Sequence, residues 1–154
     1  MKKMLFIFCA IMLAGFRSAA ADEASCNVLE IEATSKDGGI DKALKQIEGK
    51  LKKPPFSSWK SFKLIKKHTP KLVLMHPKTV SLAKGGKLTM LYRDRVDAKG
   101  KKTRLRLSFT MDDNEGSRQS DVTIKLDSGS FYMSGGRPLK SGGTYIFAAA
   151  CTVK

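Results

Sequence analysis

The fold of this chain is constrained most by a series of short segments in which apolar and polar residues alternate. The clearest spans residues 102–111, where Leu105, Leu107, Phe109 and Met111 alternate with arginine, serine and threonine. A period of two places the apolar side chains on one face of a β-strand. Similar segments span residues 60–67, 71–75, 78–83, 87–96, 120–127, 130–134 and 144–153. Short strands separated by glycine-rich turns predict an antiparallel β-sandwich or an open barrel.

The first strand is expected at residues 26–35. There Leu29 and Ile31 alternate with Glu30 and Glu32, which predicts a strand with one apolar face and one polar face. The last segment, 144–153, is apolar on both faces, so we expect it at the centre of a sheet.

Residues 40–53 change to a helical period. Their apolar residues fall at intervals of three and four, which is the pattern of an amphipathic helix. The stripe consists of Ile40, Ala43, Leu44, Ile47 and Leu51. Pro54 and Pro55 would end this helix, and no further helix is predicted after them. The predicted fold class is therefore α+β: a mostly antiparallel β-sandwich or open barrel with one N-terminal amphipathic helix packed on it.

Residues 1–21 have the features of a secretory signal peptide. Two lysines precede a twelve-residue apolar stretch, residues 4–15, and three alanines at 19–21 provide small residues for cleavage. The apolar stretch is too short to cross a bilayer core of roughly 30 Å. We therefore expect cleavage after about Ala21 and a single β-rich domain at residues 22–154. The expected location is periplasmic or secreted, with no membrane span after cleavage.

The mature chain would keep two cysteines. Cys26 lies near its start and Cys151 near its end. In an oxidising compartment such a pair predicts a disulfide, and two buried free thiols are the alternative. A disulfide at these positions would make the first and last strands antiparallel neighbours.

No catalytic or metal-binding pattern is found in the sequence. A zinc site or a catalytic triad would need cysteine, aspartate or glutamate near its histidines. The two histidines of this chain, His68 and His76, have none of these residues nearby in the sequence. Residues 112–116 place Asp112 and Asn114 at a spacing seen in calcium loops, but a hairpin turn explains them. We therefore predict a non-enzymatic protein without a metal or a cofactor.

Positive charge is concentrated in one part of the sequence. Without residues 1–21, the chain has 26 lysines and arginines against 14 acidic residues, a net charge of +12. No carboxylate lies between Glu48 and Asp94, and this acid-free segment, residues 50–93, contains twelve positive charges. The remaining residues balance, so the whole surplus comes from the acid-free segment. Such a segment would attract phosphate or carboxylate polymers.

The densest part of this segment is KKPPFSSWKSFKLIKKH, residues 52–68, with six lysines, three aromatic residues and no acid. Phe62 and Leu64 share a strand face and are expected in the core. Trp59 is either a lid over the core or an exposed contact for a ligand. The candidate polyanion-binding residues are Lys52, Lys53, Trp59, Lys60, Lys63, Lys66, Lys67 and Lys71.

Strand parity divides these lysines further. Lys63 and Lys67 would share one face of the strand at 60–67, and Lys60 and Lys66 would share the other. Only one of these groups would then be free to bind a polyanion. The alternative is a strand with a solvated lysine face and no ligand.

The stretch PPFSSWKSFKL and the ending GTYIFAA resemble small exported bacterial proteins that have a signal peptide, one helix and a β-rich domain. The resemblance covers most of the mature chain and implies export and this architecture, without an activity.

The expected function is that of an exported, non-catalytic binding or structural module of the bacterial cell envelope. Its partner would be a protein or an anionic envelope polymer. The first alternative is a polyanion-binding protein that uses the acid-free segment, with lipopolysaccharide, wall polymers, anionic lipid or DNA as ligand. A second alternative is an inhibitor of a secreted hydrolase.

Overall fold

The computed structural model describes residues 22–97 and 99–154, and the predicted signal peptide at 1–21 lies outside them. The strands are β1 (Glu23–Thr34), β2 (Gly39–Ile40), β3 (Ser61–His68), β4 (Lys71–Val73), β5 (Lys78–Ser81), β6 (Lys87–Val96), β7 (Arg104–Asp112), β8 (Arg118–Asp127), β9 (Phe131–Pro138) and β10 (Thr144–Val153). The helical turns are η1 (Lys42–Ile47), α1 (Glu48–Leu51) and η2 (Phe56–Ser58).

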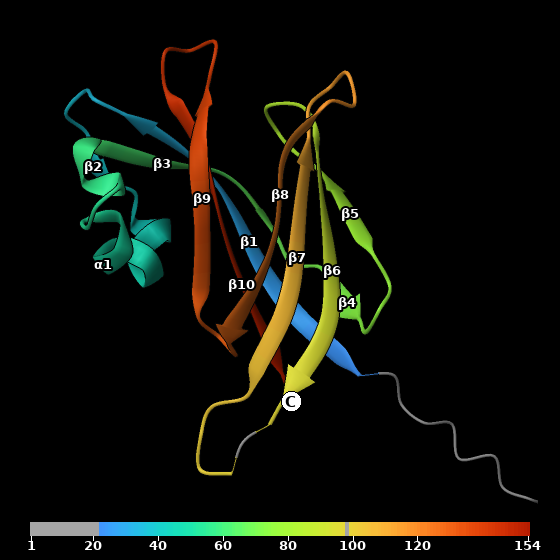
Figure 1. Ribbon diagram of the computed structural model, residues 1–154. Coiled ribbons are helices and arrows are strands. Elements are labelled where there is room, and N and C mark those ends of the chain that lie inside the picture. The colour runs from blue at the N-terminus through green and yellow to red at the C-terminus, as the bar shows by residue number, and fades with distance from the viewer. Residues whose placement is uncertain (1–21, 98) are drawn as a thin grey trace, which may run out of the picture.

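The strands form two sheets that pack as a sandwich (Figure 1). Sheet A has the order β2-β3-β1-β10-β9, with β4 also paired to β1, and sheet B has the order β5-β6-β7-β8. Nearly all pairings are antiparallel, and only β2 and β3 run parallel. The predicted fold class is therefore confirmed, and the sandwich is the architecture found.

The main core lies between the two sheets. Aromatic rings from both sheets meet there: Phe109 of β7 stacks on Tyr132 of β9 at 5.5 Å and contacts Phe147 of β10 at 5.9 Å between ring centroids. Leu105, Leu107, Phe109 and Met111, whose alternation predicted a strand, all face this core. β10 is buried on both faces because sheet B covers one side and the helical turns cover much of the other, as its apolar sequence predicted.

The helical turns η1 and α1 pack on the outer face of sheet A, and Figure 1 shows them below β3 and to the left of β9. Leu44, Ile47 and Leu51 are fully buried against this face, so the predicted helix is in the right place. Its geometry differs, because residues 42–47 form a 3₁₀ helix and only one α-turn follows. With three residues per turn, Leu44 and Ile47 align and Ala43 rotates into solvent.

Two short elements near this helix are absent from the sequence prediction. The 3₁₀ turn η2 follows Pro55 directly, where no further helix was expected. Its Phe56 and the following Trp59 pack on the cluster formed by the helical turns and sheet A, with ring centroids 6.3 Å apart. The two-residue strand β2 pairs with Ser61 and Phe62 at the start of β3.

Cys26 and Cys151 lie directly opposite each other in the antiparallel pair β1–β10. Their sulfur atoms are at disulfide distance, 2.07 Å. Since both side chains are buried in the core between the sheets, the bridge joins the first and last strands inside the sandwich.

A β-bulge at Ile65 changes the parity of β3. Leu64 pairs with Ile31, Lys66 pairs with Glu30, and Ile65 between them has no partner on β1. Directly paired residues share a face, so the residues after the bulge are shifted by one.

The predicted grouping of lysines is therefore wrong. Lys63 and Lys66 face the sheet B side of sheet A, since their partners are Glu32 and Glu30. Lys67 lies on the outer face, since its partner Leu29 is packed under the helical turns. The prediction from strand parity was wrong because the spacing of the lysines does not reveal the extra residue in β3.

Candidate functional site

The acid-free segment follows one side of the molecule. β10 pairs with β1 along ten residues, so β3 and β4 must both lie on the opposite edge of β1. Beyond Phe62, neither β3 nor β4 has a second strand neighbour in the described part of the chain. The segment therefore forms the free edge of sheet A before it crosses to β5, the edge strand of sheet B.

Four lysines mark this free edge, and we call them the lysine edge: Lys63, Lys66, Lys67 and Lys71. All four are exposed, and none forms an ion pair with a carboxylate among residues 22–97 and 99–154. Their partners on β1 run from Glu32 to Ser25, so the lysine edge extends over about 23 Å at roughly 3.3 Å per residue.

Three other predicted residues meet in a separate hollow beside the helical turns. Lys52, Trp59 and Lys60 line it together with Glu48. Lys52 pairs with Glu48 at 2.5 Å between Nζ and Oε1, and Lys60 pairs with Asp37 at 3.4 Å. These lysines are therefore partly neutralised by acids from outside the acid-free segment.

Trp59 is half-buried and packs on the helical cluster, as the core-lid alternative expected, while its remaining surface lines this hollow. Lys53 lies in the bend after α1 and is exposed. The five remaining positive charges of the acid-free segment lie on α1, on β5 and β6 and in the loop between those strands: Lys50, Lys78, Lys84, Lys87 and Arg93. The segment thus divides into several surfaces, and four of its twelve positive charges gather on the lysine edge.

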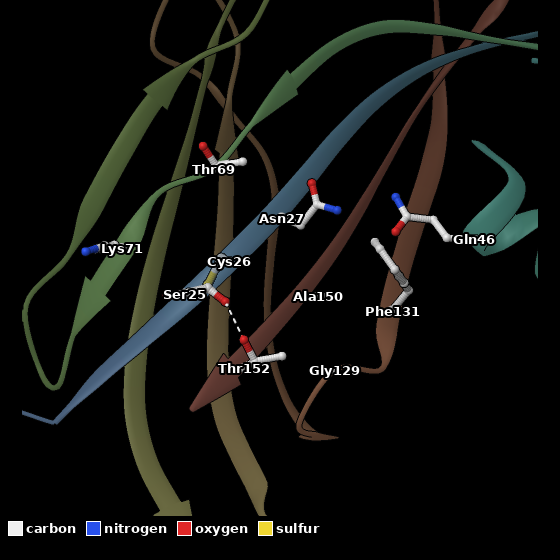
Figure 2. A pocket seen from close by; sticks show the side chains of 10 residues that line it. All are labelled: Ser25, Cys26, Asn27, Gln46, Thr69, Lys71, Gly129, Phe131, Ala150 and Thr152. Carbon is white, nitrogen blue, oxygen red and sulfur yellow. Dashed lines mark hydrogen bonds between the residues drawn. The ribbon is translucent and has the colours of Figure 1, made fainter. Parts of the chain in front are cut away.

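A second hollow opens on the outer face of sheet A where the helical turns end (Figure 2). We call it the outer-face hollow, and its main lining residues are Ser25, Asn27, Gln46, Thr69, Lys71 and Phe131. It is open to solvent with a volume of about 540 Å³, its lining contains no carboxylate, and it is bordered by Thr152, whose hydroxyl donates to the Ser25 carbonyl at 3.3 Å. Lys71 belongs to both this hollow and the lysine edge.

The most unusual buried group is the carboxylate of Glu30, which is fully inaccessible to solvent. His68 Nε2 lies 2.6 Å from its Oε1, while the Ala83 N–H donates to Oε2 at 2.9 Å and the Tyr145 hydroxyl at 3.2 Å. This cluster connects β1, β3 and β10 to the turn between β5 and β6. The sequence pattern missed it, because Glu30 was expected on a polar strand face beside Glu32.

Arg137 of β9 borders the same cluster. Its guanidinium lies 4.8 Å above the ring of Tyr145 and donates to the Gly85 carbonyl at 3.2 Å. Burial, together with the neighbouring Glu30 carboxylate, raises the pKa of Tyr145. The cluster thus holds a carboxylate, an imidazole, a phenol and a guanidinium in a network that ties the two sheets together.

The turn at 112–116 is a hairpin turn between β7 and β8, as predicted. The Asp113 carboxylate accepts from the backbone N–H groups of Glu115 and Ser117 at 2.9 and 2.8 Å. Asn114 accepts from the Gly86 N–H at 2.6 Å, which joins this turn to the β5–β6 turn. A Cβ at Gly86, where φ is +90°, would lie 2.3 Å from the Asp112 carbonyl, so the contact requires glycine.

Neither a metal site nor a membrane-spanning helix is seen in the described ranges. Among residues 22–97 and 99–154, no group of three or more histidine, cysteine, aspartate and glutamate residues could hold a metal ion. Within the same ranges, no helix combines the length and the apolar character needed to cross a membrane.

Comparison with known proteins adds no relative: no family model matches the chain, and neither the curated proteins nor the solved structures include a significant match.

Proposed function

We propose that this chain is an exported, non-catalytic binding module of the bacterial cell envelope and that its ligand is an anionic polymer. The observation that carries the proposal is the lysine edge: four exposed lysines, Lys63 and Lys66 on its inner face and Lys67 and Lys71 on its outer face, none of which forms an ion pair in the described part of the chain. Lipopolysaccharide, wall polymers, anionic lipid headgroups and extracellular DNA are polyanions of this chemistry. A cross-strand disulfide is typical of proteins outside the cytoplasm, which supports the export part of the proposal.

The lysine edge is suited to a polymer more than to a single small anion. Its charges are spread over about 23 Å of one strand edge, so consecutive anionic groups of a chain could each meet one lysine. Lysine acts as a point charge on a flexible stem and does not impose the planar geometry that arginine does. Each contact releases counterions from the polymer, which makes the affinity depend strongly on salt.

A different role for these lysines is protection of the sheet edge. Lysines on a free strand edge prevent two copies of a sheet from pairing with each other. This explanation predicts aggregation after lysine removal and no site-specific binding, so the two roles can be separated by experiment.

The test compares two variants that remove the same charge. The edge variant replaces Lys63, Lys66, Lys67 and Lys71 by glutamine. The control variant replaces four exposed lysines elsewhere by glutamine: Lys99, Lys101, Lys102 and Lys125. Heparin binding is then measured at a series of salt concentrations for the mature protein and both variants.

The edge variant should bind heparin more weakly, with a slope of log K against log salt reduced by about 3, since each lost contact lowers the slope by roughly 0.7–0.9. The control variant should retain most of the slope. Equal losses in both variants would mean that only the net charge of +12 attracts the polymer.

A further inference from the structure

The outer-face hollow exists because the helical turns cover only part of sheet A. Leu29 of β1 and Ala148 of β10 are buried under them, but Asn27 and Ala150, two residues further along each strand, line the hollow instead. Figure 2 shows Asn27, Gln46 and Phe131 around one space, although they come from β1, η1 and β9. At about 540 Å³ the hollow lies within the range of about 300–1,000 Å³ found for small-molecule sites.

Asn27 presents a side-chain amide to this hollow. Its Oδ1 atom is buried and makes no hydrogen bond within the described residues, whereas Figure 2 shows its nitrogen pointing toward Gln46. A ligand in the hollow can therefore reach the amide nitrogen, while the buried oxygen is closed to it. A hydroxyl group suits this position, because its oxygen can accept from the amide nitrogen.

The remaining lining matches a sugar ring. Gln46 and Thr69 add an amide and a hydroxyl beside Asn27, and such groups pair with ring hydroxyls. Phe131 offers an apolar surface for the C–H face of the ring. The hollow has no carboxylate and has Lys71 at its border, a charge pattern that favours a sugar with an acidic group.

We propose that the outer-face hollow binds one acidic sugar unit of a glycan chain that also contacts the lysine edge. Lys71 belongs to both surfaces, and Lys67 lies on the same outer face of β3. A glycan that follows the lysine edge therefore reaches the hollow without leaving sheet A. This inference rests on the proposed function, since it identifies the anionic polymer as a glycan.

The experiment compares two probes by titration calorimetry on the mature protein at constant salt. A hexamer of galacturonic acid supplies carboxylates and ring hydroxyls, and a linear hexaphosphate supplies charge without sugar. The variants are Asn27→Ala and Gln46→Ala in the hollow, with Gln119→Ala on sheet B as the control for loss of an exposed amide. Because Gln46 is exposed on η1, its variant tests the site even if Asn27→Ala lowers stability.

The galacturonate hexamer should bind more tightly than the hexaphosphate, and each hollow variant should weaken its binding about threefold to tenfold, as expected for one lost hydrogen bond at a partly exposed site. Hexaphosphate binding should not change in these variants, and Gln119→Ala should change neither probe. If both probes bind equally and neither hollow variant weakens the galacturonate hexamer, the sugar site is refuted and the proposed function stands. If neither probe binds, both proposals fail.

Discussion

Replacement of Glu30 by leucine tests whether the buried carboxylate organises the sandwich. Leucine has a similar size, so the change removes hydrogen-bond acceptors and leaves little empty space. Two donors would lose their acceptor: the hydroxyl of buried Tyr145 and the N–H of exposed Ala83, at 3.2 and 2.9 Å from Oε2. His68 would also lose its partner, although it lies closer to solvent.

The expected cost follows from these lost bonds. An unsatisfied buried donor costs about 1–3 kcal/mol and an ordinary hydrogen bond contributes about 0.5–1.5 kcal/mol, so the change predicts a loss of roughly 2–4 kcal/mol in the free energy of unfolding. Urea denaturation measures this loss directly. Trp59 is the single tryptophan and packs against the helical cluster on sheet A, so its fluorescence reports the transition.

Two further variants make the test specific. Glu30→Gln should cost about 1 kcal/mol or less, because its amide oxygen can accept from Tyr145 and Ala83 while its nitrogen faces His68. Glu32→Leu is the matched control, since Glu32 is only half-buried and its carboxylate accepts a hydrogen bond from the hydroxyl of exposed Ser141. If Glu30→Leu and Glu32→Leu lower the unfolding free energy equally, the cluster has no special role in stability.

Three other predictions follow from the fold. Cys151→Ser should lower the unfolding free energy by roughly 2–5 kcal/mol, and thiol labelling of the native protein without reductant should leave Cys26 unmodified in the unchanged chain; labelling of both cysteines in the native state would exclude the bridge. Leu44→Ala should cost about 2–5 kcal/mol in urea denaturation because Leu44 is fully buried, whereas exposed Lys45→Ala should change stability by less than about 0.5 kcal/mol. Burial raises the pKa of both Tyr92 and Tyr145, so the stability that this shift contributes is present below the ordinary tyrosine pKa of about 10 and is lost as the pH rises above it. An alkaline titration should therefore show phenolate absorbance from these residues only together with unfolding, and ionisation in the folded protein would contradict their burial.

Most of the strand positions along the chain could be predicted from the sequence, because alternation in segments such as Leu105 to Met111 reports which face of a strand is buried. The helix was placed correctly from Leu44, Ile47 and Leu51, but spacings of three and four suit a 3₁₀ turn and an α-turn alike. The disulfide was predicted from the positions of Cys26 and Cys151, the two cysteines that follow residue 21.

The candidate site was less predictable. Alternation predicts that Glu30 lies opposite to Leu29, but it does not reveal that both faces of a central strand are covered. The acid-free segment carries charge of one sign in the sequence, yet Glu48 and Asp37 from outside it pair with Lys52 and Lys60. The sequence pattern did not distinguish Asn27 from other polar residues, since its place in the outer-face hollow depends on where the helical turns end on sheet A.

The bulge at Ile65 also decides which length changes β3 tolerates. Ile65 is the residue of this strand that has no partner on β1, so its deletion would leave every other pair, from Ser61–Thr34 to His68–Val28, in register. The cost would be the loss of its side chain from the rim of the core between the sheets. Deletion of Leu64 or Lys66 would instead force a neighbour to take over a pairing position, and with it a face of the sheet. A natural relative one residue shorter in β3 could therefore keep both the lysine edge and the Glu30–His68 contact, provided that the missing residue is the one at the bulge.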